Sequence, residues 1–360
     1  MASGETLDFA TLVQPINAKN PAGEDLRKNT SPTSPYYMLK DERAKARAIE
    51  RKLIFDDSHT GSPQPSWRMI LEFAPQVIAE QSKDLELAAY LIEALVRERG
   101  FPGLRDGFRL VRELVESCWD ALYPLPDDEG VASRVAHLTG LNGVGGDGTL
   151  IRPILAVPIT ENSSVGCFTT ADYLQAQQLA TLDAHERQLR LTDGAVSMEM
   201  IQTAVSETPQ EFYEGLQLNI LEVLKEYDRM CTALDERCGE HSIHSSNIRN
   251  AIETCLESVR YAIGGFPVRG EAEDDTEEQS VSQQCVVPTV RIRSRNEALT
   301  ALKQVAEYFR RTEPHSPISY GAEQLVRWSQ TPLPELLSEL VPDNSAREHL
   351  FTLTGMRRAG

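Results

Sequence analysis

An acidic segment three quarters of the way along the chain restricts what this sequence can fold into. Residues Gly270–Glu278 (GEAEDDTEE) hold six carboxylates in the eight residues that start at Glu271. Carboxylates this close repel one another, and the segment has no large apolar side chain to bury, so we expect it to stay solvated and extended. The sequence therefore predicts an acidic flexible linker over residues 265–290, with a separate module at residues 291–360.

This last module has the pattern of a small helical domain that self-associates. Ser294 and Glu297 have the spacing of a capping box, and Ser316-Pro317 predicts the start of another helix. A module of this size rarely builds a sufficient core alone, and oligomerisation is one common remedy. The predicted oligomer interface consists of apolar residues on the expected helix faces, namely Leu299, Leu302, Phe309, Leu325, Trp328, Leu336 and Leu337.

The first part of the chain is also predicted to be helical, as a domain over residues 1–150 that folds on its own. Apolar residues recur there with helical spacing, Ser66 and Ser82 are placed to cap helices, and Gly100 ends one of them. Residues 150–159 (LIRPILAVPI) contain two prolines, which exclude a central strand. We interpret this stretch as an edge strand or an extended arm.

A middle helical domain is predicted over residues 160–264. Thr208 and Glu211 have capping-box spacing, and the apolar residues that follow recur at coiled-coil spacing: Leu216, Ile220, Val223, Tyr227, Met230 and Leu234. A further helix is expected to end at Gly264, and the two helices would form an antiparallel hairpin joined at 239–247. The predicted fold class is therefore all-α and multi-domain.

Charge and composition exclude several classes of protein. The net charge is −18, and residues 291–360 hold ten Lys/Arg against eight Asp/Glu, or +2, so the remainder carries −20. An acidic body argues against nucleic-acid binding, which needs a basic footprint. No apolar run approaches the ~20 residues that span a bilayer, so no membrane insertion is expected. The absence of a signal-peptide pattern and the scattered cysteines indicate a cytoplasmic protein.

Three patterns that could carry chemistry have simpler interpretations. The GxGxxG match at Gly143–Gly148 lacks the flanking strand and helix of a dinucleotide site, so it is interpreted as a loop. Cys238, His241 and His244 fail the spacing of a structural zinc site. Glu313, His315 and Ser316 lie side by side, whereas catalytic triads meet through the fold, so a rigid turn is favoured. No cofactor, metal or catalytic residue is predicted.

The order of several short motifs resembles a known family. The motifs are Pro21–Arg27 (PAGEDLR), Trp67, Ser82–Leu85 (SKDL), Gly100–Leu104 (GFPGL), Trp119, Tyr123-Pro124 and Gly148–Pro153 (GTLIRP). In this order they resemble the ImpA N-terminal domain of the TssA family of type VI secretion proteins. The ending, with Glu313–Ile318 (EPHSPI) and Arg327-Trp328, is similar to the C-terminal domain of the shorter TssA proteins.

This resemblance implies a bacterial, non-enzymatic assembly factor. Family members form ring-like oligomers through the C-terminal domain, engage the baseplate and membrane complex, and assist polymerisation of tube and sheath. The expected partners are therefore a second copy of the chain and these secretion proteins. Two alternatives remain open from the sequence. One is a soluble monomeric or dimeric adaptor, and the other is an enzyme of unrecognised class that uses Glu313, His315 and Ser316.

Overall fold

The computed structural model describes most of the first 264 residues and part of the C-terminal module. The described residues are 3–55, 65–127, 130–143, 148–239, 246–264, 302–303, 306, 310 and 317–330. The chain divides into two compact units, Met1–Gly270 (unit 1) and Glu271–Gly360 (unit 2). Among the described residues both are helical, with only isolated β-bridges. No described helix is long and apolar enough to cross a membrane.

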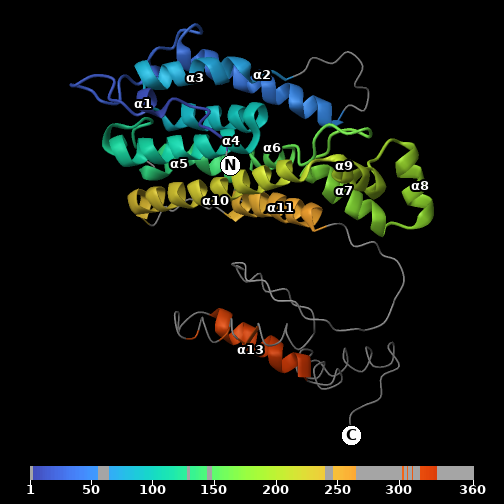
Figure 1. Cartoon of the computed structure of the whole chain (residues 1–360). Coiled ribbons are helices and arrows are strands. Elements are labelled where there is room, and N and C mark those ends of the chain that lie inside the picture. The colour runs from blue at the N-terminus through green and yellow to red at the C-terminus, as the bar shows by residue number, and fades with distance from the viewer. Residues whose placement is uncertain are drawn as a thin grey trace, which may run out of the picture. The chain divides into compact units, whose positions relative to one another are not determined.

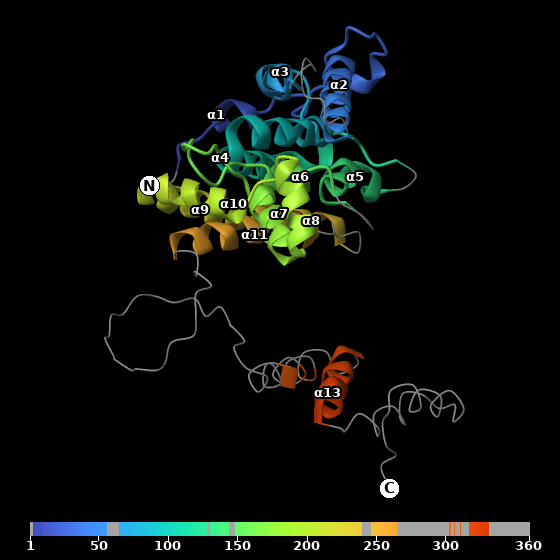
Figure 2. The ribbon, with the colours of Figure 1, turned by 90° about the vertical axis from the view of Figure 1, so that its right-hand side faces the viewer.

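Unit 1 consists of helices joined by mostly short connections. They are α1 (Phe9–Leu12), η1 (Leu26–Lys28), α2 (Pro35–Phe55), α3 (Arg68–Glu80), α4 (Leu85–Cys118), η2 (Trp119–Ala121), α5 (Val131–Asn142), α6 (Ile151–Leu155), α7 (Thr170–Thr181), α8 (Ala184–Thr192), α9 (Met198–Glu207), α10 (Gln210–Cys238) and α11 (Ser246–Ile263). The helices form three layers, with α2 and α3 on one side of α4 and with α10 and α11 on the other (Figures 1 and 2).

Helix α4 is a hairpin of two arms that meet at Gly100. This glycine has a positive φ of 59°, a conformation that only glycine adopts readily, and it reverses the chain between residues 85–99 and 101–118. The two ends of the hairpin meet, because Leu85 N donates a 2.8 Å hydrogen bond to Tyr123 O. The predicted helix stop at Gly100 is confirmed, and both arms of α4 are largely buried.

The predicted coiled-coil spacing on α10 corresponds to a buried stripe. All six residues are buried: Leu216, Ile220, Val223, Tyr227, Met230 and Leu234. Helix α10 packs against both α4 and α11, and the ring of Tyr227 lies 4.8 Å from that of Phe108 on α4. Residues from both sides of position 150 thus share one hydrophobic core. The division of unit 1 into domains at 1–150 and 160–264 stays a prediction.

The structure corrects the interpretation of residues 150–159. Ile151–Leu155 form the short helix α6, rather than an edge strand or an extended arm. Pro153 is the third residue of this helix. A proline in the first turn removes only an N–H group that has no partner within the helix, so the helix tolerates it.

Three predicted helix caps are also corrected. Asp84, not Ser82, caps α4, and Trp67, not Ser66, occupies the N-cap position of α3 without a side-chain hydrogen bond. Pro209 occupies that position of α10, and the Thr208 hydroxyl donates to Ala204 O instead of capping. In each case a residue one or two positions away fits the local backbone better than the residue that the spacing favours.

In unit 2 the described helix is α13, Pro317–Gln330, which begins at the proline that the sequence predicted to open it. Val326 is buried, whereas Tyr320 and Leu325 on the same helix are 64% and 51% exposed. Ala306, before α13 in the chain, is buried as well. The predicted linker at 265–290 and the acidic segment lie outside the described residues.

Candidate functional site: the motif junction and the amino-terminal clamp

Three of the motifs that resemble the ImpA domain meet in space at the start of α4. Backbone hydrogen bonds join three of them: Lys83 N donates to Ala22 O at 2.8 Å, Glu24 N donates to Gln81 O at 3.0 Å, and Tyr123 N donates to Lys83 O at 2.9 Å. We call this place the motif junction and define it by residues 22–27, 82–86 and 123. Its three segments are separated by up to 100 residues in the chain.

Gly23 permits the close approach of the first two segments. It has a φ of +77°, and a Cβ atom built on it would lie 2.1 Å from Gln81 O. No side chain fits there, and the backbone conformation disfavours one as well. The Tyr123 hydroxyl donates a 3.2 Å hydrogen bond to Gly23 O, so the third segment is held to the same residue.

Asp84 joins helix capping to an ion pair inside the junction. Its carboxylate is fully buried and accepts hydrogen bonds from Glu86 N at 2.8 Å and Leu87 N at 3.2 Å, the free donors at the start of α4. It also accepts from Arg27 Nη1 at 2.5 Å and Nη2 at 3.2 Å. The ion pair between Arg27 and Asp84 thus joins the first motif to the second.

Glu86 is the most heavily hydrogen-bonded carboxylate of the junction. It accepts from Arg27 Nη2 at 2.6 Å, from the Tyr36 hydroxyl at 3.0 Å, from His137 Nε2 at 2.9 Å and from the Tyr90 hydroxyl. Burial alone would raise the pKa of this carboxyl. The hydrogen bonds from His137 and Tyr90, together with Arg27, outweigh burial and hold the pKa of Glu86 well below its ordinary value of 4.5.

Lys83 is buried without a carboxylate partner and caps two helices instead. Its ammonium donates to Leu12 O at 2.8 Å, Ile78 O at 2.8 Å and Ala79 O at 3.3 Å, carbonyls at the C-terminal ends of α1 and α3. Burial lowers the pKa of Lys83 to about 8. The three carbonyl oxygens favour the charged form of Lys83, because carbonyl groups at a helix C-terminus attract a cation.

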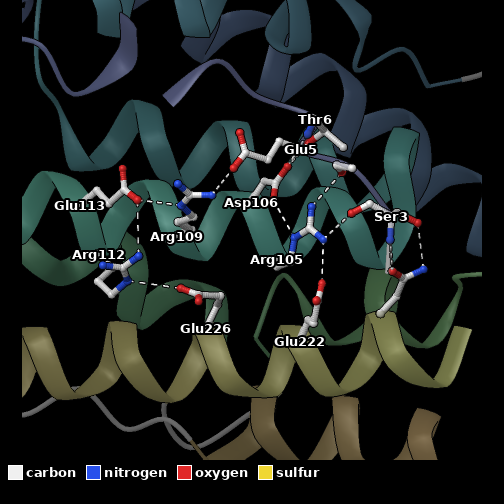
Figure 3. Close-up of polar contacts among 12 residues, drawn as sticks. Ser3, Glu5, Thr6, Arg105, Asp106, Arg109, Arg112, Glu113, Glu222 and Glu226 are labelled. Carbon is white, nitrogen blue, oxygen red and sulfur yellow. Dashed lines mark hydrogen bonds and ion pairs between the residues drawn. The ribbon is translucent and has the colours of Figure 1, made fainter. Parts of the chain in front are cut away.

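A second cluster, the amino-terminal clamp, ties residues 3–6 to α4 and α10 (Figure 3). Arg105 of α4 donates to Ser3 O and Gly4 O at 2.8 and 2.9 Å and pairs with Glu222 of α10 at 2.8 Å. Asp106, fully buried, accepts from Thr6 N at 2.5 Å and from the Thr6 hydroxyl at 2.8 Å. One arginine therefore joins the amino-terminal segment to both helices.

Two further arginines extend this clamp along α4, as Figure 3 shows. Arg109 contacts Glu5 at 2.6 Å, and Arg112 contacts Glu226 of α10 at 3.3 Å. The clamp holds the amino terminus on a surface built jointly by α4 and α10. Sequence reasoning missed it, because the first residues have no periodic pattern and their partners lie about a hundred positions away.

These clusters are suited to hold elements together rather than to react. Their carboxylates are paired, and Asp84, Glu86 and Asp106 are buried. No group of three or more His, Cys, Asp or Glu in the described part of the chain could hold a metal ion. The glycine-rich loop predicted at Gly143–Gly148 follows helix α5 rather than a strand. Cys238 is buried at the end of α10. His241 and His244 lie outside the described residues.

The predicted interface residues are only partly described. Leu325 is half exposed on α13, and Leu302 and Trp328 are half-buried. The other four predicted residues fall outside the described part: Leu299, Phe309, Leu336 and Leu337. Glu313, His315 and Ser316, the residues of the enzyme alternative, also lie outside it. The interface therefore stays a prediction.

The lowered pKa of Glu86 leads to a prediction about the stability of the protein in acid. A folded-state pKa below the unfolded value means that ionised Glu86 contributes stability above about pH 4.5, and that this contribution is lost as the pH falls further. We expect Glu86→Gln to lower the melting temperature at neutral pH and to flatten its decline between about pH 5 and pH 3. Thermal melts across this range, with the exposed Glu72→Gln as control, check it. An unchanged acid slope in Glu86→Gln would contradict the assignment.

Comparisons with known proteins agree with the motifs of the junction. A family model described as ImpA, N-terminal, type VI secretion system matches residues 13–143, which contain the whole junction. The chain is 26% identical over 360 residues to the type VI secretion system component TssA1 of Pseudomonas aeruginosa, an alignment that covers 94% of this chain and 96% of that protein.

A solved structure has the same fold as unit 1. It is the N-terminal domain, including the ImpA_N region, of the TssA component of the type VI secretion system from Burkholderia cenocepacia. It is 26% identical with a TM-score of 0.59, and the match covers 72% of this chain and 95% of that structure. Residues 13–143 therefore match the ImpA N-terminal family model, and along most of its length the chain is similar to TssA proteins of the type VI secretion system.

Proposed function

We propose that this chain is a structural assembly component of a bacterial type VI secretion system that forms ring-like oligomers through residues 291–360. The observation that carries the proposal is the match to TssA1 along 94% of this chain and 96% of that protein, which spans both units. That relative is described as a component of the type VI secretion system. In this proposal the chain is a structural component and not an enzyme.

Unit 1 acts in this proposal as an arm, and unit 2 as the part that self-associates. The motif junction and the amino-terminal clamp use their polar groups internally, which favours a rigid body for unit 1. Half-exposed Leu325 in unit 2 is the kind of apolar side chain that a second copy would cover. The acidic linker would let the arms reach baseplate, tube, sheath and membrane-complex proteins. In this proposal the protein acts in the cytoplasm and belongs to the shorter class of TssA proteins.

A pair of leucine substitutions tests the role of unit 2. Leu325 is 51% exposed on α13, and Leu218 is 44% exposed on α10 of unit 1, so the two are matched in type and exposure. We expect Leu325→Asp to reduce the mass of the assembled protein, because a carboxylate would be buried unpaired in the interface. Leu218→Asp should leave the mass unchanged. Equal masses for both variants and the unaltered chain would show that Leu325 is not part of the interface.

Sheath assembly in cells tests the secretion role. Bacteria that lack their own copy of this gene should fail to form sheaths, and the unaltered gene should restore them. The Leu325→Asp variant should restore them poorly and Leu218→Asp fully. Normal sheaths without the gene would contradict the proposed function, whereas a protein that restores sheaths as a monomer or dimer would support the adaptor alternative instead.

A further inference from the structure

A row of arginines lies on α2, and the carboxylates of the described residues pair with only part of it. Arg43, Arg47 and Arg51 are spaced four residues apart and therefore share one face of the helix. Arg97 of α4 lies close enough to affect the same site electrostatically. We call these four residues the arginine row. The row is notable in a chain whose net charge is −18.

Two members of the row are fixed by glutamates and aromatic rings. Arg43 pairs with the fully buried Glu93 and lies over the Tyr90 ring at 4.5 Å. Arg97 pairs with Glu50 through Nε at 2.6 Å and Nη2 at 2.9 Å. Its guanidinium lies over the Trp67 ring at 4.1 Å. Both guanidinium groups are therefore held in place by the carboxylates they bind.

The other two members of the row have no such partner. In the part of the chain that the structure describes, no carboxylate pairs with Arg47 or Arg51. Arg47 is half-buried and Arg51 is exposed. Burial lowers the pKa of Arg47, Glu93 raises it, and the charges of Arg43, Arg51 and Arg97 lower it further. Among the described residues, two glutamates pair with two of these four arginines, which leaves two guanidinium groups without a carboxylate partner there.

We propose that Arg47, with Arg51 beside it, is a docking site for a carboxylate side chain from an acidic segment of a partner protein. The site already binds two carboxylates by the same chemistry, and a third would complete the pattern at the guanidinium that lacks one. Arginine suits this role because its planar fork binds a carboxylate through two parallel hydrogen bonds. The proposal is independent of ring formation, since it concerns unit 1 alone.

A nucleic acid fits the row less well than an acidic peptide. Nucleic-acid binding needs an extended basic surface that contacts several phosphates, whereas this site offers two guanidinium groups that no described carboxylate pairs with. The strongly negative chain would also repel a polyanion at long range. A short acidic segment carries its negative charge only at the arginine row, so the rest of the chain repels it less than it repels a long polyanion.

The test measures fluorescence anisotropy of a labelled hexaglutamate peptide against the purified full-length protein at low ionic strength. We expect saturable binding that Arg47→Gln weakens by at least about tenfold, the loss expected for a charged hydrogen-bonded pair. Lys45→Gln removes the same charge from a 67%-exposed position on α2 outside the row, and should change the affinity little. Arg47→Gln should leave the melting temperature almost unchanged, because no carboxylate among the described residues pairs with Arg47.

Four outcomes of these measurements would overturn the proposal, and a fifth comes from a further variant. The four are no saturable binding of hexaglutamate, equal binding of hexaglutamine, equal weakening by Lys45→Gln and Arg47→Gln, and tighter Arg47-dependent binding of duplex DNA than of the peptide. A further variant replaces the six carboxylates of Gly270–Glu278 by amides and should bind hexaglutamate as the unaltered chain does. A gain of about tenfold or more in that variant would show that the chain's own acidic segment occupies the site, which would overturn the assignment to a partner.

Discussion

Replacing Arg27 with methionine is expected to destabilise unit 1 by about 3 kcal/mol or more. Arg27 is the cation that faces both Asp84 and Glu86, whose side chains are 0% and 3% exposed. Removing it would leave two buried carboxylates without that counter-charge. Breaking a buried pair on one side is costly because the remaining charge cannot return to water.

The control for this prediction is an arginine in a pair of the same type at the surface. Arg68 and Glu72 form an i,i+4 pair whose side chains are 79% and 60% exposed. Such pairs contribute little to stability, so Arg68→Met should leave the unfolding midpoint almost unchanged. Urea unfolding of both variants and the unaltered chain measures the difference. Equal midpoints for Arg27→Met and Arg68→Met would mean that the motif junction does not depend on its ion pairs.

Gly23→Ala is expected to have an effect of similar size for a different reason. The added Cβ would lie 2.1 Å from Gln81 O, 2.6 Å from Ile16 Cδ1 and 2.9 Å from the Gln81 carbonyl carbon, so the segments of the motif junction would have to separate. The positive φ adds backbone strain of about 1–2 kcal/mol. We expect a total loss of about 3 kcal/mol or more, since both effects act at once.

Gly130→Ala separates the two causes. Gly130 has a φ of +69°, close to the +77° of Gly23, but no atom lies within 4 Å of the position that its Cβ would take. This variant therefore has the backbone strain without the clash. Thermal melts should show a much larger fall for Gly23→Ala than for Gly130→Ala. Equal falls would show that backbone conformation alone makes Gly23 necessary.

Much of the helical content could be predicted from the sequence, since it depends on local periodicity. The stripe of α10 is buried as its spacing indicates, and Gly100 ends the first arm of α4. Short elements were less predictable. Residues 151–155 were interpreted as extended because they contain a proline, but the position of that proline in the first turn is compatible with a helix.

The motif junction illustrates the limit of sequence reasoning. The motifs containing Arg27 and Asp84 were identified by their order, yet no periodicity predicts that residues 57 positions apart form an ion pair. The same holds for Arg105 and Ser3 in the amino-terminal clamp. Such contacts depend on the path of the chain through the fold, so single residues carry no signal of them. The predicted caps were wrong for a related reason, because the residue at which a helix begins depends on the path of the preceding chain. Trp67 and Pro209, which make no side-chain cap, occupy the N-cap positions of α3 and α10.

The mass of the purified protein in solution tests the central proposal most directly. Light scattering after size-exclusion chromatography should give a mass many times that of the 40.1 kDa chain for residues 1–360. A chain that ends at residue 264 keeps every described helix of unit 1 and should elute as a folded protein of much lower mass. A full-length protein that is monomeric, or a shortened chain that keeps the full oligomer, would contradict self-association through residues 291–360.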